Sequence, residues 1–316
     1  MTKNGRGEHM QSGQIEILMA AYNGMPYIRE QIDSILKQTD TNWHLTVSDD
    51  GSTDGTDAVI DDYARRYPDK VERVFAGQKF GEARAHFFWL TRRCKAAYIA
   101  YCDDDDVWYA DKLEKLRRAM REAERKKEGP TLVFSDQTVT DERMNALAPS
   151  LMRYQNQYFG QFDYRSILLQ NVVTGGAMMV NRALADLAVR CKDVEQTAMH
   201  DWWMAAVAAR FGQIAYVDEP LGVYRQHGSN SVGAKDVSSL AYVTRKLGAL
   251  GEVKKTIQKK KAQAAAFART YDADLSDADR RFLQTMSKAH SGLTFYWQNR
   301  KQIHGLFRRL GFVVLG

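Results

Sequence analysis

The chain has 316 residues, of which 44% are hydrophobic and 27% charged, and this balance excludes a disordered or fibrous protein. Its length predicts one large domain, or a domain with a helical appendage. The formal net charge of +6 raises nucleic acid and anionic membranes as partners. No recognition motif accompanies that charge, and the Lys and Arg clusters fall on expected helices. We therefore expect no nucleic-acid partner.

Three features of the sequence bear on where the protein works. Residues 1–13 lack the apolar core of a signal peptide, and we expect a flexible tail there. No run of 18 apolar residues predicts a membrane-spanning helix. Cys94, Cys102 and Cys191 show neither CxxC nor zinc spacing, which is typical of reduced thiols. These features predict a cytoplasmic protein.

Strands and helices alternate through the first 105 residues. Short, mostly apolar runs predict strands at residues 15–22, 44–48, 71–75 and 98–102. Between them, helical spacing predicts helices across residues 28–36, 56–67 and 82–95. This order predicts a parallel sheet covered by helices, whose ligands bind beyond the carboxyl ends of the strands. Polar residues stand at three of those ends: Tyr22 and Asn23, Asp49 and Asp50, and Asp103 to Asp106.

The second half of the chain is less regular. We expect a helix at residues 204–210 and a strand at residues 214–217. From about residue 235 the pattern changes to long helical stretches rich in Lys, Ala, Gln and Arg, so we place a loose boundary there. No glycine-rich phosphate-binding motif occurs anywhere in the chain, so any bound phosphate must be neutralised in another way.

The run Asp103 to Asp106 is the most informative local feature. Packed carboxylates repel one another and resist burial, and a divalent cation would remove that conflict. Oxygen ligands suit Mg²⁺ or Mn²⁺, which keep positions for water and phosphate oxygens. If the backbone stays extended, Asp103 and Asp105 point to one side and Asp104 and Asp106 to the other. The alternative is a solvated acidic turn in which Asp106 or Asp111 caps the next helix.

Asp49 and Asp50 end the second expected strand. A carboxylate at that place can accept the N3–H of a uracil or thymine ring, and Asp50 is the preferred acceptor, with Asp49 next. The alternative is a turn-forming aspartate beside Gly51.

Asp201 and His227 are the chemical candidates of the second half. Asp201 stands beside Trp202 and Trp203, where a carboxylate with a raised pKa could act as a general base and an indole could stack on a sugar. The alternative is a helix N-cap with core tryptophans. His227 lies in a Gly/Ser/Asn loop and could be a metal ligand that favours Mn²⁺, or simply an exposed histidine. Arg225 could face phosphate.

Six motifs together resemble glycosyltransferase family 2, and within it the bacterial rhamnosyltransferase-like branch. They are Met-Ala-Ala-Tyr-Asn-Gly (19–24), Ser-Asp-Asp-Gly-Ser-Thr-Asp-Gly-Thr (48–56), Tyr-Cys-Asp-Asp-Asp-Asp-Val-Trp (101–108), Thr-Gly-Gly-Ala-Met-Met (174–179), His-Asp-Trp-Trp (200–203) and Tyr-Arg-Gln-His-Gly-Ser-Asn (224–230). The resemblance implies the α/β GT-A fold, a Rossmann-like, mostly parallel sheet flanked by helices. It spans residues 14–235, divided into a nucleotide-binding half (14–108) and an acceptor half (109–235). A helical C-terminal region (236–316) follows.

The family pattern also implies roles for single residues. It makes Asp201 the catalytic base and places Asp103, Asp105 and His227 at the metal. The donor nucleotide sugar is expected to contact Ala20, Tyr22, Asn23, Asp49, Asp50, Arg84, Asp103, Asp104 and Trp202. The branch commonly has Gln where this chain has Asp104, which leaves open which carboxylate touches the metal.

The expected reaction is inverting, dependent on Mn²⁺ or Mg²⁺, and moves a sugar from a UDP- or dTDP-sugar to a hydroxyl of a saccharide or lipid-linked acceptor. Rhamnose is one candidate sugar, and cell-surface polysaccharide synthesis is the expected setting. The rivals are a nucleotidyltransferase and a scaffold protein with a retired site. The basic, apolar end at residues 301–316 could rest on the inner face of the cell membrane, or pack on the domain or on a second subunit of a homo-oligomer.

Overall fold

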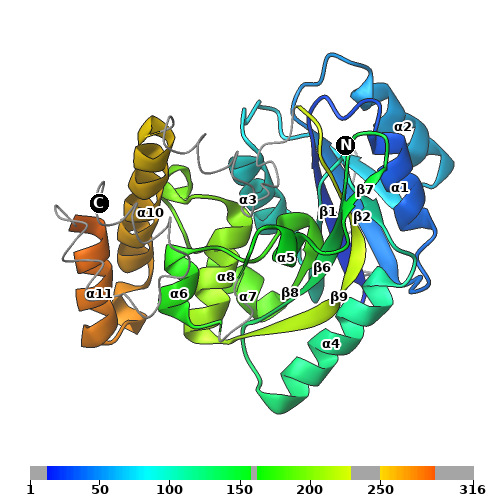
Figure 1. Ribbon diagram of the computed structural model, residues 1–316. Coiled ribbons are helices and arrows are strands. Elements are labelled where there is room, and N and C mark those ends of the chain that lie inside the picture. The colour runs from blue at the N-terminus through cyan, green and yellow to red at the C-terminus, as the bar shows by residue number, and fades with distance from the viewer. Residues whose placement is uncertain (1–12, 158–161, 229–249, 289–316) are drawn as a thin grey trace, which may run out of the picture.

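The computed structural model describes residues 13–157, 162–228 and 250–288 and is built around a nine-stranded sheet (Figure 1). Its strands are β1 (Ile15–Ala21), β2 (Trp43–Asp49), β3 (Val71–Val74), β4 (Tyr98–Cys102), β5 (Val107–Trp108), β6 (Thr131–Thr140), β7 (Ala146–Ala148), β8 (Met178–Asn181) and β9 (Gln213–Arg225). They lie in the order β3-β2-β1-β4-β8-β6-β9-β5, and β7 pairs with β6. The first four strands are parallel, as the sequence predicted, whereas β8 is antiparallel to both β4 and β6.

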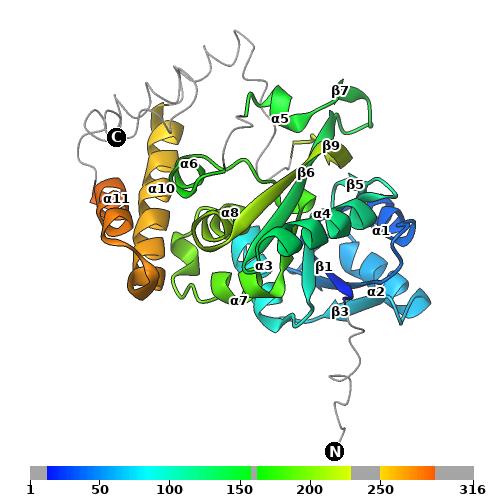
Figure 2. The ribbon, with the colours of Figure 1, turned by 90° about the horizontal axis from the view of Figure 1, so that it is seen from below.

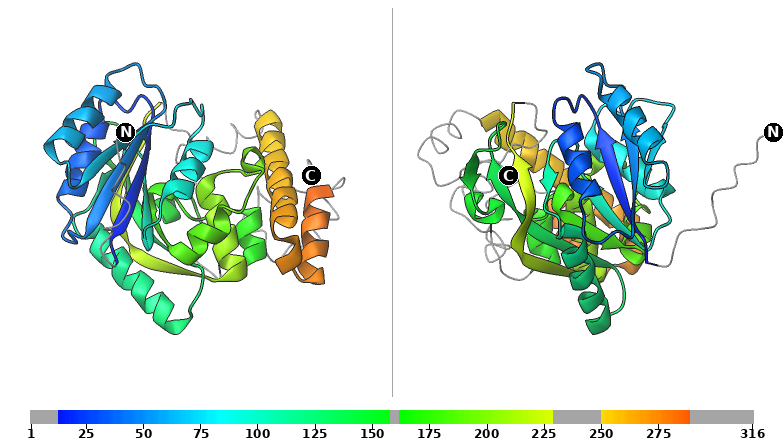
Figure 3. Two further views of the ribbon diagram at one scale, coloured as in Figure 1. Left: turned by 180° about the vertical axis from the view of Figure 1, so that it is seen from behind. Right: turned by 90° about the vertical axis from the view of Figure 1, so that its right-hand side faces the viewer.

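Helices cover both faces of this sheet. They are α1 (Ile28–Leu36), α2 (Thr56–Arg66), α3 (Ala83–Arg93), α4 (Lys112–Lys126), α5 (Leu151–Tyr154), α6 (Tyr164–Leu169), α7 (Arg182–Ala188), α8 (His200–Phe211), α10 (Leu250–Tyr271) and α11 (Asp277–Lys288). Helices α1, α2 and α4 share one hydrophobic core with the sheet, and α3, α6, α7 and α8 share the other. Figures 2 and 3 show α10 and α11 at the opposite end of the molecule from α1 and α2.

The register of the central strands brings the polar strand ends to one edge. Residue Met19 of β1 is paired with Val47 of β2 on one side and with Cys102 of β4 on the other. The residues that follow these strands therefore leave the sheet side by side. Strand β1 is buried on both faces, with Ile17 in one core and Leu18 in the other, which explains its continuous apolar sequence.

The strands of the second half are longer and more polar than the sequence suggested. Strand β9 extends from Gln213 to Arg225, and only its first part coincides with the expected strand at residues 214–217. Its pairing with β6 shifts register near Asp136, opposite Pro220, where proline cannot donate to the ladder. The helix expected at residues 204–210 is confirmed within α8.

Helix α10 packs into the hydrophobic core that α3, α6, α7 and α8 share. The ring of Trp203 in α8 lies 5.4 Å from Phe267 and 5.9 Å from Tyr271, measured between centroids. The boundary expected near residue 235 falls in the stretch 229–249, outside the described residues, and so does the basic end at 301–316. Among the helices that the structure describes, none combines the length and apolarity required to span a membrane.

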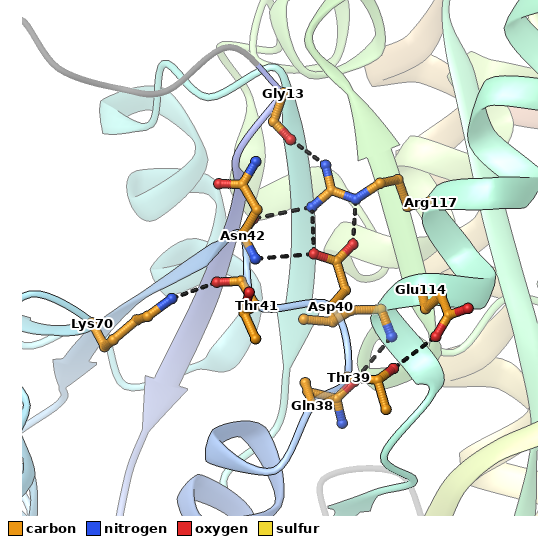
Figure 4. Close-up of polar contacts among 10 residues, drawn as sticks. Gly13, Gln38, Thr39, Asp40, Thr41, Asn42, Lys70, Glu114 and Arg117 are labelled. Atoms are coloured by element: carbon orange, nitrogen blue, oxygen red, sulfur yellow. Dashed lines mark hydrogen bonds and ion pairs between the residues drawn. The ribbon is translucent and has the colours of Figure 1, made fainter.

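A buried ion pair ties α4 to the opposite edge of the sheet from the polar strand ends (Figure 4). The guanidinium of Arg117 pairs with the carboxylate of Asp40 and also donates to the backbone oxygens of Gly13 and, at 3.0 Å, Asn42. The hydroxyl of Thr39 donates to Glu114 of the same helix at 2.8 Å. These bonds fix α4 against the starts of β1 and β2, and thereby fix the position of its first residue, Lys112.

We predict that Arg117→Met lowers the free energy of unfolding by about 3 kcal/mol, because it leaves the half-enclosed Asp40 carboxylate without its cation. Urea denaturation followed by circular dichroism measures the change. The exposed neighbour Arg118, changed to Met in the same helix, is the matched control and should shift stability by less than about 0.5 kcal/mol. Equal losses from the two variants would contradict the role of the ion pair.

Candidate active site

The aspartate run bends sharply where β4 ends. Atom Oδ2 of Asp104 accepts the backbone N–H of Tyr22 at 2.9 Å, and Oδ2 of Asp105 lies 2.8 Å from Nε2 of His227. Asp106 accepts from Nε2 of Gln137 at 3.1 Å and is 1% exposed. Each of these carboxylates therefore faces a different segment of the chain.

The predicted alternation of an extended backbone is wrong for this run. A Cβ placed on Gly176 would lie 2.9 Å from Oδ2 of Asp103 and 2.9 Å from Oδ2 of Asp106, so these two side chains share one side. The pairing of β4 with β1 stops at Cys102, and the chain beyond it is free to turn toward β5. Asp111 occupies the N-cap position of α4, as the alternative interpretation expected, but its side chain makes no capping hydrogen bond.

Gly175 and Gly176 separate the aspartate run from Asp201. The N–H of Gly175 donates to Oδ2 of Asp201 at 3.1 Å, while Gly176 faces Asp103 and Asp106. Neither glycine has a positive φ, so close approach and not backbone conformation demands glycine here. No role was predicted for Gly175 and Gly176 from the sequence. The feature that could have indicated one is the double glycine itself, which lies outside any turn motif.

Burial makes this site unusual electrostatically. Burial, with help from the charge of Asp105, raises the pKa of Asp103 to about 7 and that of Asp104 to about 8. The same two causes place the pKa of Asp106 well above its ordinary value. Burial also raises the pKa of Asp201 to about 7, although the N–H groups of Trp202 and Gly175 oppose the shift. A cation beside the run would relieve this cost.

The end of β9 folds back over the aspartate run. Nε of Arg225 donates to the backbone oxygen of Asp105 at 2.9 Å. The backbone N–H of Arg225 donates to the carboxylate of Asp106 at 3.3 Å. Its guanidinium also pairs with Glu30 and lies 4.7 Å from the ring centroid of Tyr27. The structure thus engages Arg225 with protein groups that hold the run in place.

The fit of a divalent metal to these residues is partial. Among the described residues, no three His, Cys, Asp or Glu side chains converge on a common metal position, so Asp103 does not join Asp105 and His227. Asp105 and His227 do meet, as a carboxylate and an imidazole. Mg²⁺ and Mn²⁺ commonly take few protein ligands and fill the remaining positions with water and phosphate oxygens. The pair therefore fits an ion that is completed by a phosphate-bearing ligand.

The expected nucleobase residues organise the loops beside the run. The carboxylate of Asp50 is 5% exposed and accepts the N–H groups of Phe80 at 2.6 Å and Gly81 at 2.7 Å. Asp49 accepts the N–H groups of Gly51 and Ser52, both at 3.0 Å, which is the turn-forming arrangement. A base contact at Asp50 would have to use the lone pairs that remain.

The turn after β1 borders the same loops. Tyr22 follows Ala20 and Ala21, is 52% exposed, and has Nζ of Lys79 4.6 Å from its ring centroid. The side chain of Asn23 accepts the N–H of Thr53 at 2.9 Å. The exposed ring of Tyr22 gives this edge a flat aromatic surface.

Arg84 is held by neighbouring protein groups. Its guanidinium pairs with Glu82 and donates to the backbone oxygen of Thr197. It therefore ties the loop before α3 to the segment that leads into Asp201.

The indoles of the two expected tryptophans bond away from Asp201, and Trp202 meets this carboxylate through its backbone N–H. Trp203 is completely buried and donates to the backbone oxygen of Ala188 at 3.0 Å. Trp202 donates from its indole to Ile167 at 2.6 Å, and Nζ of Lys260 lies 5.8 Å from its ring centroid. Asp201 lies in the first turn of α8 and is not its N-cap, which is Met199.

Comparisons with known proteins bear on the class of this site. The family model described as Glycosyl transferase family 2 matches residues 16–187. The chain is 29% identical over 230 residues to the dTDP-rhamnosyl transferase RfbG of Shigella flexneri, covering 68% of this chain and 74% of that protein.

Two solved structures share the arrangement of strands and helices. S. aureus TarS 1–349 superposes with a TM-score of 0.58 at 14% identity, covering 95% of this chain and 81% of that one, and TarS 1–349 has also been solved with UDP-GlcNAc. The mannosyltransferase PcManGT of Pyrobaculum calidifontis, in complex with GDP-Man and Mn²⁺, superposes at 0.51 with 15% identity over 96% and 86% of the two chains. The predicted GT-A fold is confirmed.

We predict that Asp104→Asn stabilises the metal-free protein as pH rises. The pKa of Asp104 is raised in the folded state, so wild-type stability is lost between about pH 4 and pH 8, as the unfolded chain releases its proton first. Asparagine keeps an acceptor for Tyr22 but carries no charge. The gain should reach on the order of 3 kcal/mol near pH 9.

Thermal unfolding in EDTA across this pH range measures the difference between Asp104→Asn and wild type. Asp69→Asn, at an exposed position, is the control and should give a flat difference. A gain that does not grow with pH would contradict the assignment of a costly buried charge to Asp104.

Proposed function

The chain belongs to glycosyl transferase family 2, and on that premise we propose that it is an inverting, metal-dependent transferase acting on a UDP- or dTDP-sugar. One observation carries this proposal. A half-buried carboxylate, Asp201, stands across two glycines from a run of carboxylates, so a base and a diphosphate site would adjoin without merging. A single displacement between these two groups inverts the anomeric carbon.

Asp105 and His227 are the residues we propose as metal ligands, with Asp103 as a partner once the donor diphosphate is bound. The contact between the Asp105 carboxylate and the His227 imidazole supports this choice. A bound Mn²⁺ or Mg²⁺ would offset the negative charge that develops on the leaving diphosphate. Asp50, Tyr22 and the surrounding turns would then hold the nucleoside, with the exposed ring of Tyr22 available to its base.

Asp201 is the proposed general base. Its raised pKa of about 7 gives it a useful affinity for the proton of an acceptor hydroxyl while leaving it ionised at slightly alkaline pH. The N–H groups of Gly175 and Trp202 orient its two oxygens. The hydroxyl oxygen attacks the anomeric carbon, the bond to the diphosphate breaks, and the proton passes to Asp201.

Similarity to a dTDP-rhamnosyl transferase supports rhamnose as the sugar and a saccharide or lipid-linked acceptor in cell-surface polysaccharide synthesis. The three cysteines of the chain are free and buried, which supports a reducing, cytoplasmic location. A nucleotidyltransferase is disfavoured because the turn after β1 carries neither glycine-rich nor basic character. A scaffold with a retired site would bind nucleotide without releasing diphosphate.

We predict that Asp201→Asn reduces sugar transfer about a thousandfold and leaves nucleotide affinity within about twofold, because the amide cannot take the proton. Release of nucleoside diphosphate, with isolated bacterial membranes as acceptor source, measures transfer, and calorimetry measures binding. Asp186→Asn, at an exposed helix position, is the control. In wild type, kcat should rise with pH through a midpoint near 7 and then level off. Parallel loss of transfer and binding in Asp201→Asn would refute the base.

We further predict that EDTA removes activity and that Asp105→Ala weakens Mn²⁺-dependent binding of UDP or dTDP at least about tenfold, because it removes a proposed metal ligand. Isothermal titration with and without Mn²⁺ measures this. His44→Ala, which removes a histidine from the far side of β2, is the control. Equal affinity for UDP or dTDP with and without Mn²⁺ would contradict the proposed metal ligands, and it would leave the proposal of Asp201 as the base unaffected.

A further inference from the structure

Lys112 is a buried cation without a part in the chemistry described above. It is the first residue of α4 and is only 1% exposed. Its ammonium donates to the backbone oxygen of Gly176 and lies 4.0 Å from the ring centroid of Trp108. Gly222 closes the space around it, since a Cβ there would lie 3.8 Å from Nζ. An ammonium this deep is costly unless opposite charges adjoin it.

Burial lowers the pKa of Lys112 to about 8, and the negative charges of Cys102, Asp106 and Asp103 oppose that shift without a direct ion pair to the ammonium. Two of these groups belong to the aspartate run. The carboxylates of Asp103 and Asp106 approach Gly176 within 2.9 Å of its Cβ position, and the ammonium of Lys112 bonds to the oxygen of the same residue. One cation and two carboxylates therefore surround a single glycine. By contrast, Asp104 and Asp105 turn outward, to Tyr22 and His227.

A lysine at this position could have reached solvent instead. Lys115, one helical turn along α4, does so and pairs with Asp111 and Glu219 at the surface. The inward direction of Lys112 is therefore set by the site. It is also fixed in place, because the Arg117 ion pair anchors α4 to the sheet.

We propose that Lys112 is a built-in counter-cation of the aspartate run. It balances Asp103 and Asp106 when no divalent ion is present, and so leaves Asp105 to face the metal with His227. Lys112 is a positioning residue, since it acts on the run and not on the substrate. The second part of this inference rests on the proposed metal site, whereas the first part does not.

The test uses the full-length protein and its melting temperature. Methionine keeps the straight side chain of lysine and removes the charge. In EDTA, Lys112→Met should lower the melting temperature by about 5–10 °C, because two buried carboxylates lose their cation. With MnCl₂ and UDP present, the loss should fall to less than half, since the divalent ion then supplies positive charge. Lys115→Met is the matched control and should lose at most about 2 °C, equally in both conditions.

A double substitution separates charge balance from packing. Asp106→Asn removes one carboxylate, so Asp106→Asn combined with Lys112→Met should recover at least half of the loss in EDTA. The same loss with and without Mn²⁺, together with no recovery in the double variant, would overturn the proposal. Insolubility of both variants while Lys115→Met is soluble would overturn it as well.

The two proposals fail in different ways. If MnCl₂ and UDP do not raise the melting temperature of wild type, the metal part of the proposed function fails. The double variant in EDTA still decides whether Lys112 balances the run, because that arm contains no metal.

Discussion

The structure depends on one constraint, which is that several carboxylates cannot be buried together without partners. Asp103 to Asp106 leave a strand that is enclosed on both faces, so the chain must supply those partners locally. The turn after β1 gives an N–H to Asp104, the end of β9 gives His227 to Asp105, and β6 gives Gln137 to Asp106. Segments distant in sequence converge here, and each provides a hydrogen-bond partner for one carboxylate.

The same constraint keeps the aspartate run apart from Asp201. The run is surrounded by polar groups and one buried cation, whereas Asp201 sits beside Trp202 at the start of a mostly apolar helix. Burial dominates the pKa of Asp201, and two backbone N–H groups fix its orientation. Gly175 and Gly176 hold the two environments at a separation that any larger side chain would increase. The aspartate run and Asp201 are therefore close to each other without sharing a hydrogen bond through their side chains.

The sequence was sufficient for the first half of the fold and for the meeting of the polar strand ends at one end of the sheet. Continuous apolar runs, such as that of β1, predicted parallel strands whose ends meet. Asp50 after β2 and Asp103 after β4 marked two of those ends. It was insufficient for β6, where Ser135, Asp136 and Gln137 are buried, and where Asp136 and Gln137 bond to Ser150 and Asp106 of other segments. The bend of the aspartate run and the inward direction of Lys112 could not be predicted from the sequence for the same reason. Local periodicity carries no information about a partner 64 residues away.

Part of the support for the segment that leads into Asp201 comes from α10, outside the part of the chain that matches the family model, which ends at residue 187. Oxygen Oε1 of Gln263 in α10 accepts the N–H of Ala198 at 2.9 Å, and Arg84 donates to the adjacent Thr197. The segment that leads into Asp201 is thus held both by Arg84 of α3 and by Gln263 of α10. Because α10 also buries Phe267 against Trp203, a change in this helix alters the setting of Asp201 without touching the aspartate run. The setting of Asp201 therefore depends both on the part of the chain that matches the family model and on α10.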